Sequence, residues 1–580
     1  MQKEFYLKNG KVMINLTAKY CDTPEKLFES STFKAVLLKY LKKIKYKDTA
    51  VYEYIYGGTK IDEVEILMKS IINVFKLLMV FKSEDIEKLN LKYKDLFLKK
   101  DSFILFIEDF YKFWRKIERY TIIQDNKPGE GFQNVSFIEA NNRFSQLILY
   151  TYRKIEENIL NCKPQIYRQL PAGGNAGLIL NTVKWPCPKD YKCLENVPFI
   201  KSIMIDPPFI IYPKKNTRDG MFSECFENPI KGCNINVNHW FCYPAKVGDL
   251  LAYIYFHRDF MAHGVTMCNL FQIAKEDEYE NRKPDIVYVF GMKDSCEKMK
   301  TVFYDDTENG IMLGYINYNE NIDYFGYMKK MTLTLHNLIM IKRGYLPIHG
   351  AMVNIVTKDK KTANIIIMGD SGAGKSESLE AFRELGDNYI SDMKVIFDDM
   401  GTIRLNADDE ILSYGTEIGA FVRLDDLDTG YAFREIDRSI FMNPDKINAR
   451  LVVPVSSYDE ITKGYPVNLF LYANNYEDGS ELEFFESYSE AISVFREGAR
   501  VAKGTTTEKG LVRTYFANPF GPAQKSEDTE KLLNRYFKKF FENGIKVGQL
   551  RTRLGIPGKE KDGPKRAAIK LLEEIRNIDK

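Results

Sequence analysis

The stretch ANIIIMGDSGAGKSES, residues 363–378, decides the fold of the C-terminal half of the chain. An apolar run of β-strand type, residues 365–368, leads directly into Gly-x-x-x-x-Gly-Lys-Ser, and a segment of helix-forming residues follows. Glycines let the backbone turn its N–H groups toward phosphate oxygens, and the start of the following helix adds a positive dipole end. A chance glycine loop before a core helix would not require strand, loop, Lys-Ser and helix in this order. The stretch therefore predicts a site for a phosphorylated ligand.

Two side chains of this loop are expected to take part in binding the ligand. Lys375 adds a mobile positive charge, and the hydroxyl of Ser376 is expected to bind a Mg²⁺ ion. The phosphates themselves are expected to contact Gly369, Asp370, Ser371, Gly372, Ala373, Gly374, Lys375 and Ser376.

Length and composition limit the class of protein. A chain of 580 residues is too long for one ordinary core, and 44% apolar with 28% charged residues is typical of a soluble globular protein. A net charge of +3 gives no global basic field for nucleic acid. The nine cysteines lack a paired framework, and neither a leader segment nor a run long enough to span a membrane is evident. We expect a cytoplasmic enzyme with no nucleic-acid or membrane partner, and its oligomeric state stays open.

The spacing of apolar residues and of turn-forming residues changes twice along the chain. Residues 1–160 carry apolar residues at three- and four-residue intervals, which predicts a helical N-terminal extension. Residues 161–325 alternate short β-type runs with turn clusters, which predicts a mixed α/β domain on the substrate side. Residues 326–580 hold the glycine loop within alternating strands and helices. The fold class is therefore predicted as α/β, with a mixed-sheet nucleotide domain.

Three side chains near the glycine loop could bind a transition metal. A neutral His349, the carboxylate of Asp392 and an unprotonated Lys330 are together suitable ligands for a divalent ion such as Mn²⁺. The lysine qualifies only if burial and a nearby metal lower its pKa. The alternative is a structural histidine beside solvated lysines, and the residues alone leave both interpretations open.

Two arginines are candidates for holding an anionic substrate. Arg450 precedes an apolar strand, and Arg168 lies beside paired glycines. The planar guanidinium suits bidentate binding of carboxylate or phosphate. A surface ion pair for Arg450 and a turn position for Arg168 are the alternatives. Residues 503–510, KGTTTEKG, have the composition of a mobile lid.

The order of these features resembles a known family. Residues 326–350, GYMKKMTLTLHNLIMIKRGYLPIHG, resemble the segment of phosphoenolpyruvate carboxykinases in which Met-Lys-Lys precedes a metal-binding histidine. The loop GDSGAGKSE is more similar to that of HPr kinase/phosphorylase, a relative of the carboxykinases. Asn448-Ala449-Arg450 resembles the family's Asn-Thr-Arg, and residues 503–510 resemble its lid. The resemblance covers about 325–580 well, 161–325 faintly and 1–160 not at all.

The resemblance implies an enzyme that converts oxaloacetate and a phosphoryl donor, ATP in the first instance, to phosphoenolpyruvate and CO₂. It implies Lys330, Lys375, Arg450 and Arg168 as catalytic residues. It also implies Mn²⁺ at Lys330, His349 and Asp392, and Mg²⁺ at Ser376. GTP and pyrophosphate remain possible donors.

Carboxykinases have two adjacent aspartates after the loop helix, whereas the corresponding pair in this chain is expected to be Asp392-Met393. Either Asp392 binds the metal alone, or Asp398 or Asp399 contributes, or the site is altered. The alternatives in function are an HPr-kinase-like protein or small-molecule kinase with Asp392 as base, and a catalytically silent nucleotide-binding regulator.

Overall fold

The structure is a computed structural model. It describes residues 5–17, 20–45, 50–89, 99–124, 137–163, 172–294, 298–370, 372–385, 389–424, 427, 430–502, 510–560 and 562–577. Two compact units result, one formed by Met1–Thr182 with Ile200–Phe209, the other by Val183–Phe199 with Ile210–Lys580. These bounds differ from the expected segments 1–160, 161–325 and 326–580, because strands beyond residue 160 group with the N-terminal helices.

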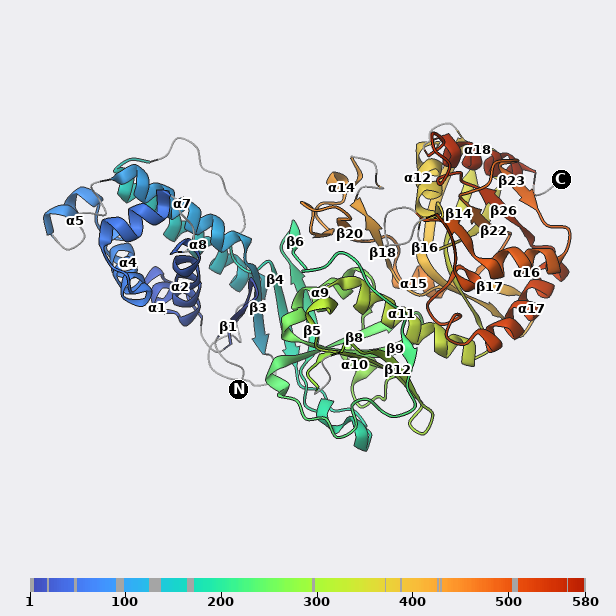
Figure 1. The fold of residues 1–580 in the computed structure, drawn as a ribbon, viewed down its shortest axis with the longest axis horizontal. Helices are drawn as coiled ribbons and strands as arrows, with labels where there is room; N and C mark the ends of the chain where they lie inside the picture. The colour runs from blue at the N-terminus through green and yellow to red at the C-terminus, as the bar shows by residue number, and fades with distance from the viewer. Residues whose placement is uncertain are drawn as a thin grey trace. The chain divides into compact units, whose positions relative to one another are not determined.

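The first unit combines helices with a small sheet (Figure 1). Its helices are α1 (Pro24–Glu29), α2 (Ser31–Lys45), α3 (Ala50–Tyr52), the π-helix η1 (Glu53–Gly57), α4 (Val64–Leu78), α5 (Ser83–Leu89), α7 (Lys100–Lys116) and α8 (Phe137–Leu160). Its strands are β1 (Phe5–Lys8), β2 (Lys11–Asn15), β3 (Glu118–Gln124), β4 (Ala176–Asn181) and β5 (Phe199–Ile205), adjacent in that order. The expected helical extension is therefore present but incomplete, since the described part of residues 1–160 also forms the strands β1, β2 and β3.

The second unit contains two large sheets. The first has the strand order β8 (Trp240–Val247), β9 (Leu250–His257), β11 (Ile286–Met292), β13 (Ile311–Asn317), β12 (Thr301–Asp306) and β7 (Ser223–Glu224), with β10 (Gln272–Ile273) paired to β8. Strands β9, β11 and β13 are parallel neighbours. Every residue of β11 and β13 is buried, which explains why both read as continuous apolar runs in the sequence.

The second sheet carries the glycine loop. Its order is β21 (Tyr465–Pro466), β17 (Ile411–Gly415), β16 (Ile390–Leu405), β14 (Leu346–Thr357), β15 (Thr362–Met368), β22 (Leu469–Asn474), β26 (Lys546–Arg551) and β23 (Leu482–Phe484). Strands β15, β22 and β26 run parallel, while β14 pairs antiparallel with both β15 and β16. The sheet is therefore mixed, as the predicted fold class requires.

Helices cover both faces of this sheet. Alternate residues of β15 point to opposite faces. Ile365 and Ile367 pack with Phe382 of α12 (Lys375–Glu384) and Leu571 of α18 (Asp562–Arg576). On the other face, Ile366 and Met368 pack with residues of α16 (Tyr488–Glu497) and α17 (Ser526–Glu542). Figure 1 shows the two helix pairs on either side of the strands.

Smaller elements complete the second unit. A small sheet contains β18 (Gly419–Arg423), β20 (Arg450–Pro454) and β19 (Ile440–Met442), and β24 (Ala499–Val501) pairs with β25 (Leu511–Arg513). The division of the chain into two units falls within strand β6 (Phe209–Ile211), between Phe209 and Ile210. The remaining α-helices are α9 (Met261–Thr266), α10 (Glu276–Tyr279), α11 (Phe325–Lys342), α14 (Tyr431–Arg434) and α15 (Tyr458–Thr462). The 3₁₀ helices are η3 (Lys189–Leu194), η4 (Val237–His239), η5 (Arg258–Phe260), η6 (Met267–Asn269), η7 (Glu320–Ile322) and η9 (Tyr515–Ala517).

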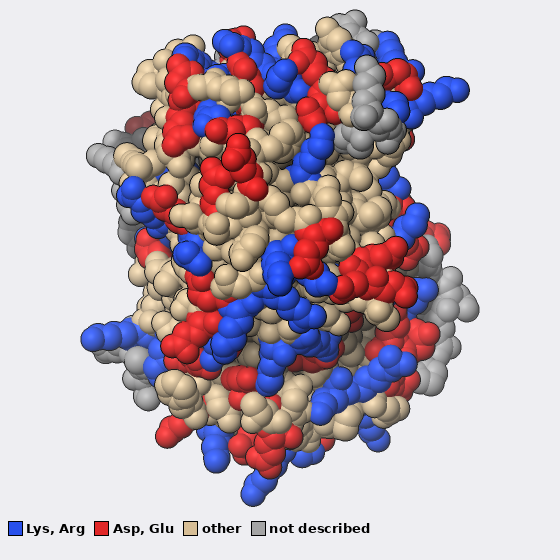
Figure 2. Space-filling model, turned by 90° about the vertical axis from the view of Figure 1, so that its right-hand side faces the viewer, with Lys and Arg blue, Asp and Glu red and all other residues tan. Residues whose placement is uncertain are grey.

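Surface charge and helix hydropathy bear on the expected partners. Figure 2 shows acidic and basic side chains interspersed over the face that it displays, in line with the small net charge. Within the described ranges, every helix is too short or too polar to cross a bilayer.

Candidate functional site

The glycine loop has the backbone that its sequence predicts. Strand β15 ends at Met368 and α12 begins at Lys375, so the loop connects a strand directly to a helix N-terminus. Gly372 and Gly374 have φ of 81° and 111°, a region that side chains with a Cβ rarely adopt. A Cβ on Gly374 would also lie 2.6 Å from Oγ1 of Thr552. The loop therefore needs glycine at this position for both conformation and space.

The charge of the loop is buried. Lys375 is 6% exposed and its Nζ donates to the carbonyl of Gly369, so the ammonium lies back over the loop. Burial lowers the pKa of Lys375, although Asp399 and Asp370 oppose this. Ser371 and the side chain of Ser376 lie outside the described residues, and the Mg²⁺ expected at Ser376 stays a prediction.

Asp370, the second residue of the loop, anchors it to neighbouring elements. Its Oδ2 accepts from Nε of Arg500 in β24 at 3.0 Å and from Oγ1 of Thr514 at 2.9 Å. Its Oδ1 lies 3.6 Å from Nδ1 of His349. Asp370 therefore acts as a structural link behind the loop, in addition to the phosphate contact expected of its backbone.

Lys330 and His349 meet at a third residue, Asp399. Nζ of Lys330 lies 2.7 Å from Oδ2 of Asp399, and Nε2 of His349 lies 2.7 Å from Oδ1 of the same carboxylate. Nζ of Lys329 also lies 2.6 Å from that Oδ2. Helix α11 supplies both lysines, while β14 and β16 supply the histidine and the aspartate. The structure thus brings together two of the three expected metal ligands.

Asp392, the third expected ligand, lies elsewhere on the same strand. In the β14–β16 ladder Asp392 pairs with Val356, whereas Asp399 pairs with Gly350, next to His349. Val356 lies seven positions after His349 along β14, which at about 3.3 Å per position is about 23 Å. The sequence alone does not give the register of β16 against β14, and this register decides which aspartate lies beside His349. The structure corrects the acid at Lys330 and His349 from Asp392 to Asp399.

Asp399 has an unusual backbone. Its φ of 104° lies in the left-handed region, and a bulge interrupts the ladder a few residues away, between Met352 and Val353. Such a conformation in a non-glycine residue costs about 1–3 kcal/mol and is concentrated at functional sites. Asp399 is the second of two adjacent aspartates. The first, Asp398, is also buried and lies near Lys375.

The protonation of this group follows from burial and charge. Burial raises the pKa of Asp399, but Lys329, Lys330 and His349 outweigh it and hold that pKa well below its ordinary value. Burial lowers the pKa of Lys330 to about 8, although Asp399 opposes this. Burial also lowers the pKa of His349, with Lys375 acting in the same direction. Both candidate nitrogen ligands are thus shifted toward the neutral forms that bind metals.

The contacts of His349 fit a divalent cation. Nδ1 faces the carbonyl oxygen of Ala517 at 2.9 Å, while Nε2 faces Asp399. A neutral imidazole has one N–H, so one of these acceptors would face a nitrogen lone pair. A cation shared by Nε2 and the carboxylate removes that conflict, and imidazole, carboxylate and amine are acceptable Mn²⁺ ligands. Among the described residues no cluster of three His, Cys, Asp or Glu side chains could hold a metal, so a metal here depends on the amine of Lys330.

A cavity adjoins Lys375 and Asp399. Its volume is about 130 Å³, and Arg423 and Arg450 line it from β18 and β20. The two arginines are direct cross-strand partners in the β18–β20 ladder, so their side chains lie on the same face of that small sheet. Nε of Arg450 is buried without a hydrogen-bond partner among the described residues, and its guanidinium lies 5.2 Å from the ring centre of Phe421. Arg450 thus lines the cavity beside Lys375, and its expected role in holding an anionic substrate stays a prediction. Arg423, which lines the same cavity, is an arginine that the sequence analysis missed.

Arg168 lies outside the described residues, and a different arginine lies near Lys330. The guanidinium of Arg218 is 5.4 Å from the ring centre of Phe520, and Nζ of Lys330 is 4.6 Å from the same ring. Arg218 belongs to a turn-rich segment, 216–220, whose composition gave no signal beyond a loop. Residues 503–509 of the expected lid also lie outside the described residues.

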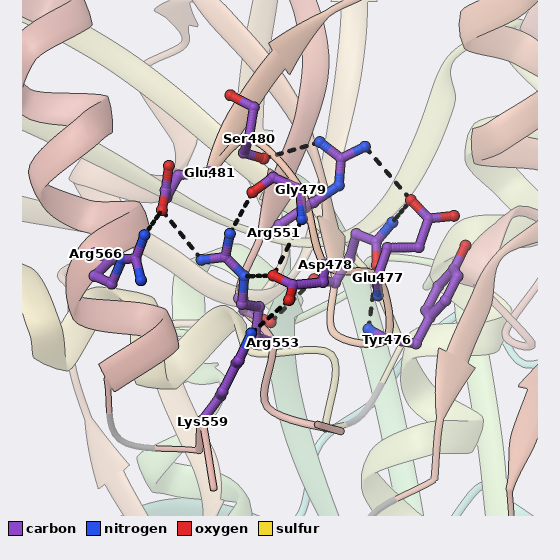
Figure 3. Close-up of polar contacts among 12 residues, drawn as sticks. Tyr476, Glu477, Asp478, Gly479, Ser480, Glu481, Arg551, Arg553, Lys559 and Arg566 are labelled. Atoms are coloured by element: carbon purple, nitrogen blue, oxygen red, sulfur yellow. Dashed lines mark hydrogen bonds and ion pairs between the residues drawn. The ribbon is translucent and has the colours of Figure 1, made fainter. Parts of the chain in front are cut away.

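An ionic network borders the glycine loop on the side of β22 and β26. Asn475 donates to the carbonyl of Gly372 at 2.9 Å, and the segment that follows it contains the acids Glu477, Asp478 and Glu481. Figure 3 shows Asp478 between Arg553 and Lys559, and Glu481 between Arg553 and Arg566. The positive charges of this wall are thus already paired within the protein.

No protein-family model matches this chain, and no curated protein matches it either.

Proposed function

We propose that this protein is a phosphoenolpyruvate-carboxykinase-like enzyme. It would convert oxaloacetate and a nucleoside triphosphate, ATP in the first instance, to phosphoenolpyruvate, CO₂ and a nucleoside diphosphate. The observation that carries the proposal is the joint contact of Lys330 and His349 with Asp399, beside the glycine loop. The family resemblance supplies the same lysine and histidine at the same spacing.

The residues support a division of labour in the proposed reaction. The backbone amides of 369–374 and the ammonium of Lys375 would hold the β- and γ-phosphates at the start of α12. Arg450 and Arg423, with Arg218 near Lys330, would bind the substrate's carboxylates in fixed orientation. Held in this way, the C–C bond to the leaving carboxylate breaks, CO₂ departs, and the enolate oxygen attacks the γ-phosphorus as the nucleoside diphosphate leaves.

A divalent ion at Lys330, His349 and Asp399 would act as a Lewis acid toward the enolate and phosphoryl oxygens. The protein's own part is to keep these ligands ready. The adjacent lysines hold the pKa of Asp399 low, which keeps its carboxylate ionised. Burial lowers the pKa of Lys330 to about 8. The carbonyl of Ala517 faces Nδ1 of His349 and so orients the ring with Nε2 toward the carboxylate.

The test is direct synthesis of phosphoenolpyruvate. Purified protein is incubated with oxaloacetate, Mn²⁺ and Mg²⁺ and, in separate reactions, ATP, GTP, inosine triphosphate or pyrophosphate. We expect phosphoenolpyruvate with at least one donor, and its loss in Asp399→Asn. Absence of product with every donor, in both directions of the reaction, would contradict the proposal.

A second candidate function, a kinase acting on a hydroxyl, rests on Asp398. Its side chain lines the cavity beside Lys375, and burial followed by the charge of Asp399 raises its pKa. A carboxylate with a raised pKa is a suitable general base toward a hydroxyl. In this function Asp398 replaces Asp392, the base expected from the sequence. Donor-dependent phosphorylation of proteins or hydroxyl compounds, with no phosphoenolpyruvate formed, would favour this candidate, and donor binding without any turnover would favour a regulator.

A further inference from the structure

Glu417 is the most deeply buried acid near the proposed metal ligands, and no step above uses it. Its side chain is 0% exposed, and it lies between β17 and β18. The backbone on both sides is fixed, because the N–H of Thr416 donates to Met400 and the N–H of Ile418 donates to Leu270. Burying a carboxyl group costs free energy unless another group compensates it. We therefore expect a group beside the buried carboxyl of Glu417 that compensates this cost.

That partner is Lys329. Its Nζ lies 3.1 Å from Oε2 of Glu417 and 2.6 Å from Oδ2 of Asp399, and both side chains of the Lys329–Glu417 pair are 0% exposed. The ammonium therefore lies between two acids that come from different strands of the fold. Lys330, the next residue, contacts the same Oδ2 of Asp399 but is 13% exposed.

The two lysines differ in what else holds them. Lys329 has a second acid, Glu417, that fixes its position. The ammonium of Lys330 pairs with a single acid of the described ranges, Asp399, and lies over the ring of Phe520. A fixed Lys329 keeps Oδ2 of Asp399 in place, so Oδ1 faces Nε2 of His349. Loss of a group that orients a metal ligand in this way typically costs roughly 10–100-fold in metal affinity.

We infer that Glu417 is a positioning residue for a divalent-metal site, which acts by holding Lys329 against Asp399. This inference rests on the proposed function, because it takes Lys330, His349 and Asp399 as the ligands. The part of Glu417 is to place an oxygen atom 3.1 Å from the ammonium of Lys329. An amide oxygen in the same position therefore serves as well as the carboxyl oxygen, and an apolar side chain does not.

The experiment measures Mn²⁺ affinity by electron paramagnetic resonance on the full chain, without substrates, so the readout does not depend on turnover. We expect Glu417→Leu to weaken Mn²⁺ binding about 10–100-fold and Glu417→Gln to stay within about threefold of wild type. Asp305→Asn is the matched control, because Asp305 also pairs with a lysine of α11, Lys342, but in an exposed contact. It should leave Mn²⁺ affinity unchanged.

A double-mutant cycle separates positioning from general damage to the fold. In a Lys329→Met background, Glu417→Leu should cause no further loss of Mn²⁺ affinity, because the residue through which it acts is gone. Replacing both members of the buried pair by apolar residues also avoids leaving an unpaired charge inside the protein.

The outcomes distinguish this inference from the proposed function. Wild-type Mn²⁺ affinity in a folded Glu417→Leu variant would overturn the positioning role while leaving the site intact. Equal losses in Glu417→Leu with and without Lys329 would do the same. If His349→Ala and Asp399→Asn bind Mn²⁺ as wild type does, no metal binds at these ligands, and both the inference and the metal site of the proposed function fail.

Discussion

Asp399→Asn and Asp392→Asn form a pair of substitutions that separates the two candidate acids. Asp399 is in contact with Lys329, Lys330 and His349, whereas Asp392 is exposed on the same strand. Both substitutions keep the size of the side chain and remove one negative charge. The difference between their effects therefore measures the surroundings of each carboxylate.

The expected magnitudes follow from burial. Removing the charge of Asp399 leaves the 0%-exposed Lys329 with Glu417 as its remaining acid, and breaking a buried ion pair in this way costs about 3–5 kcal/mol. That is a large share of the roughly 5–15 kcal/mol by which a typical domain is stable. An exposed substitution such as Asp392→Asn is expected within about 0.5 kcal/mol of wild type.

The assay combines thermal unfolding with Mn²⁺ titration of each variant. We expect Asp399→Asn to lower the unfolding midpoint by several degrees and to abolish measurable Mn²⁺ binding, with Asp392→Asn unchanged in both. The assignment of the site would be refuted by the reverse pattern, in which Asp392→Asn loses Mn²⁺ and Asp399→Asn keeps it. Equal, small effects of both would show that neither aspartate is a ligand.

Three further predictions test other parts of the site. His349→Ala should lose Mn²⁺-dependent turnover but keep donor binding, measured with a fluorescent nucleotide, and equal loss of both would indicate a structural histidine. Burial raises the pKa of Glu417 from 4.5 to about 8, so its contribution to stability is present below about pH 4.5 and is lost as the pH rises through 8. Glu417→Gln should therefore unfold at a midpoint that depends less on pH between 5 and 8, and an unchanged pH profile would exclude this titration. Gly374→Ala should reduce donor binding at least tenfold, because the loop has φ of 111° and no room for a Cβ, and unaltered binding in the same fluorescence assay would show that the loop adapts.

The fold around the glycine loop was predictable because its signals are local. A strand, a turn that needs glycine, and a helix follow one another within residues 363–378, and each depends on its own residues. The hairpin of β1 and β2 was also accessible from sequence, since Asn9-Gly10 between alternating residues is a strong turn signal. It was missed because the helical periodicity of the following segments dominated the interpretation.

The candidate site was less predictable because its members come from distant elements. Asp399 and Asp392 differ little in local composition, and only the register of β14 against β16 decides which one lies beside His349. Arg218 and Arg423 have no local signal either. Their place depends on Phe520 and on the pairing of β18 with β20, which residue spacing along the chain does not encode.

Gly350 occupies a position in β14 that has a consequence for how the site can move. It pairs with Met368, the last residue before the glycine loop, on one side and with Asp399 on the other. Backbone hydrogen bonds across β15, β14 and β16 thus determine the distance between the glycine loop, which would hold the phosphoryl donor, and Asp399, which would bind the metal. A slip of one residue would turn Asp399 to the opposite face of the sheet. The spacing of the two reacting partners is therefore a property of the rigid sheet, and any closure around a substrate has to come from elements outside these strands.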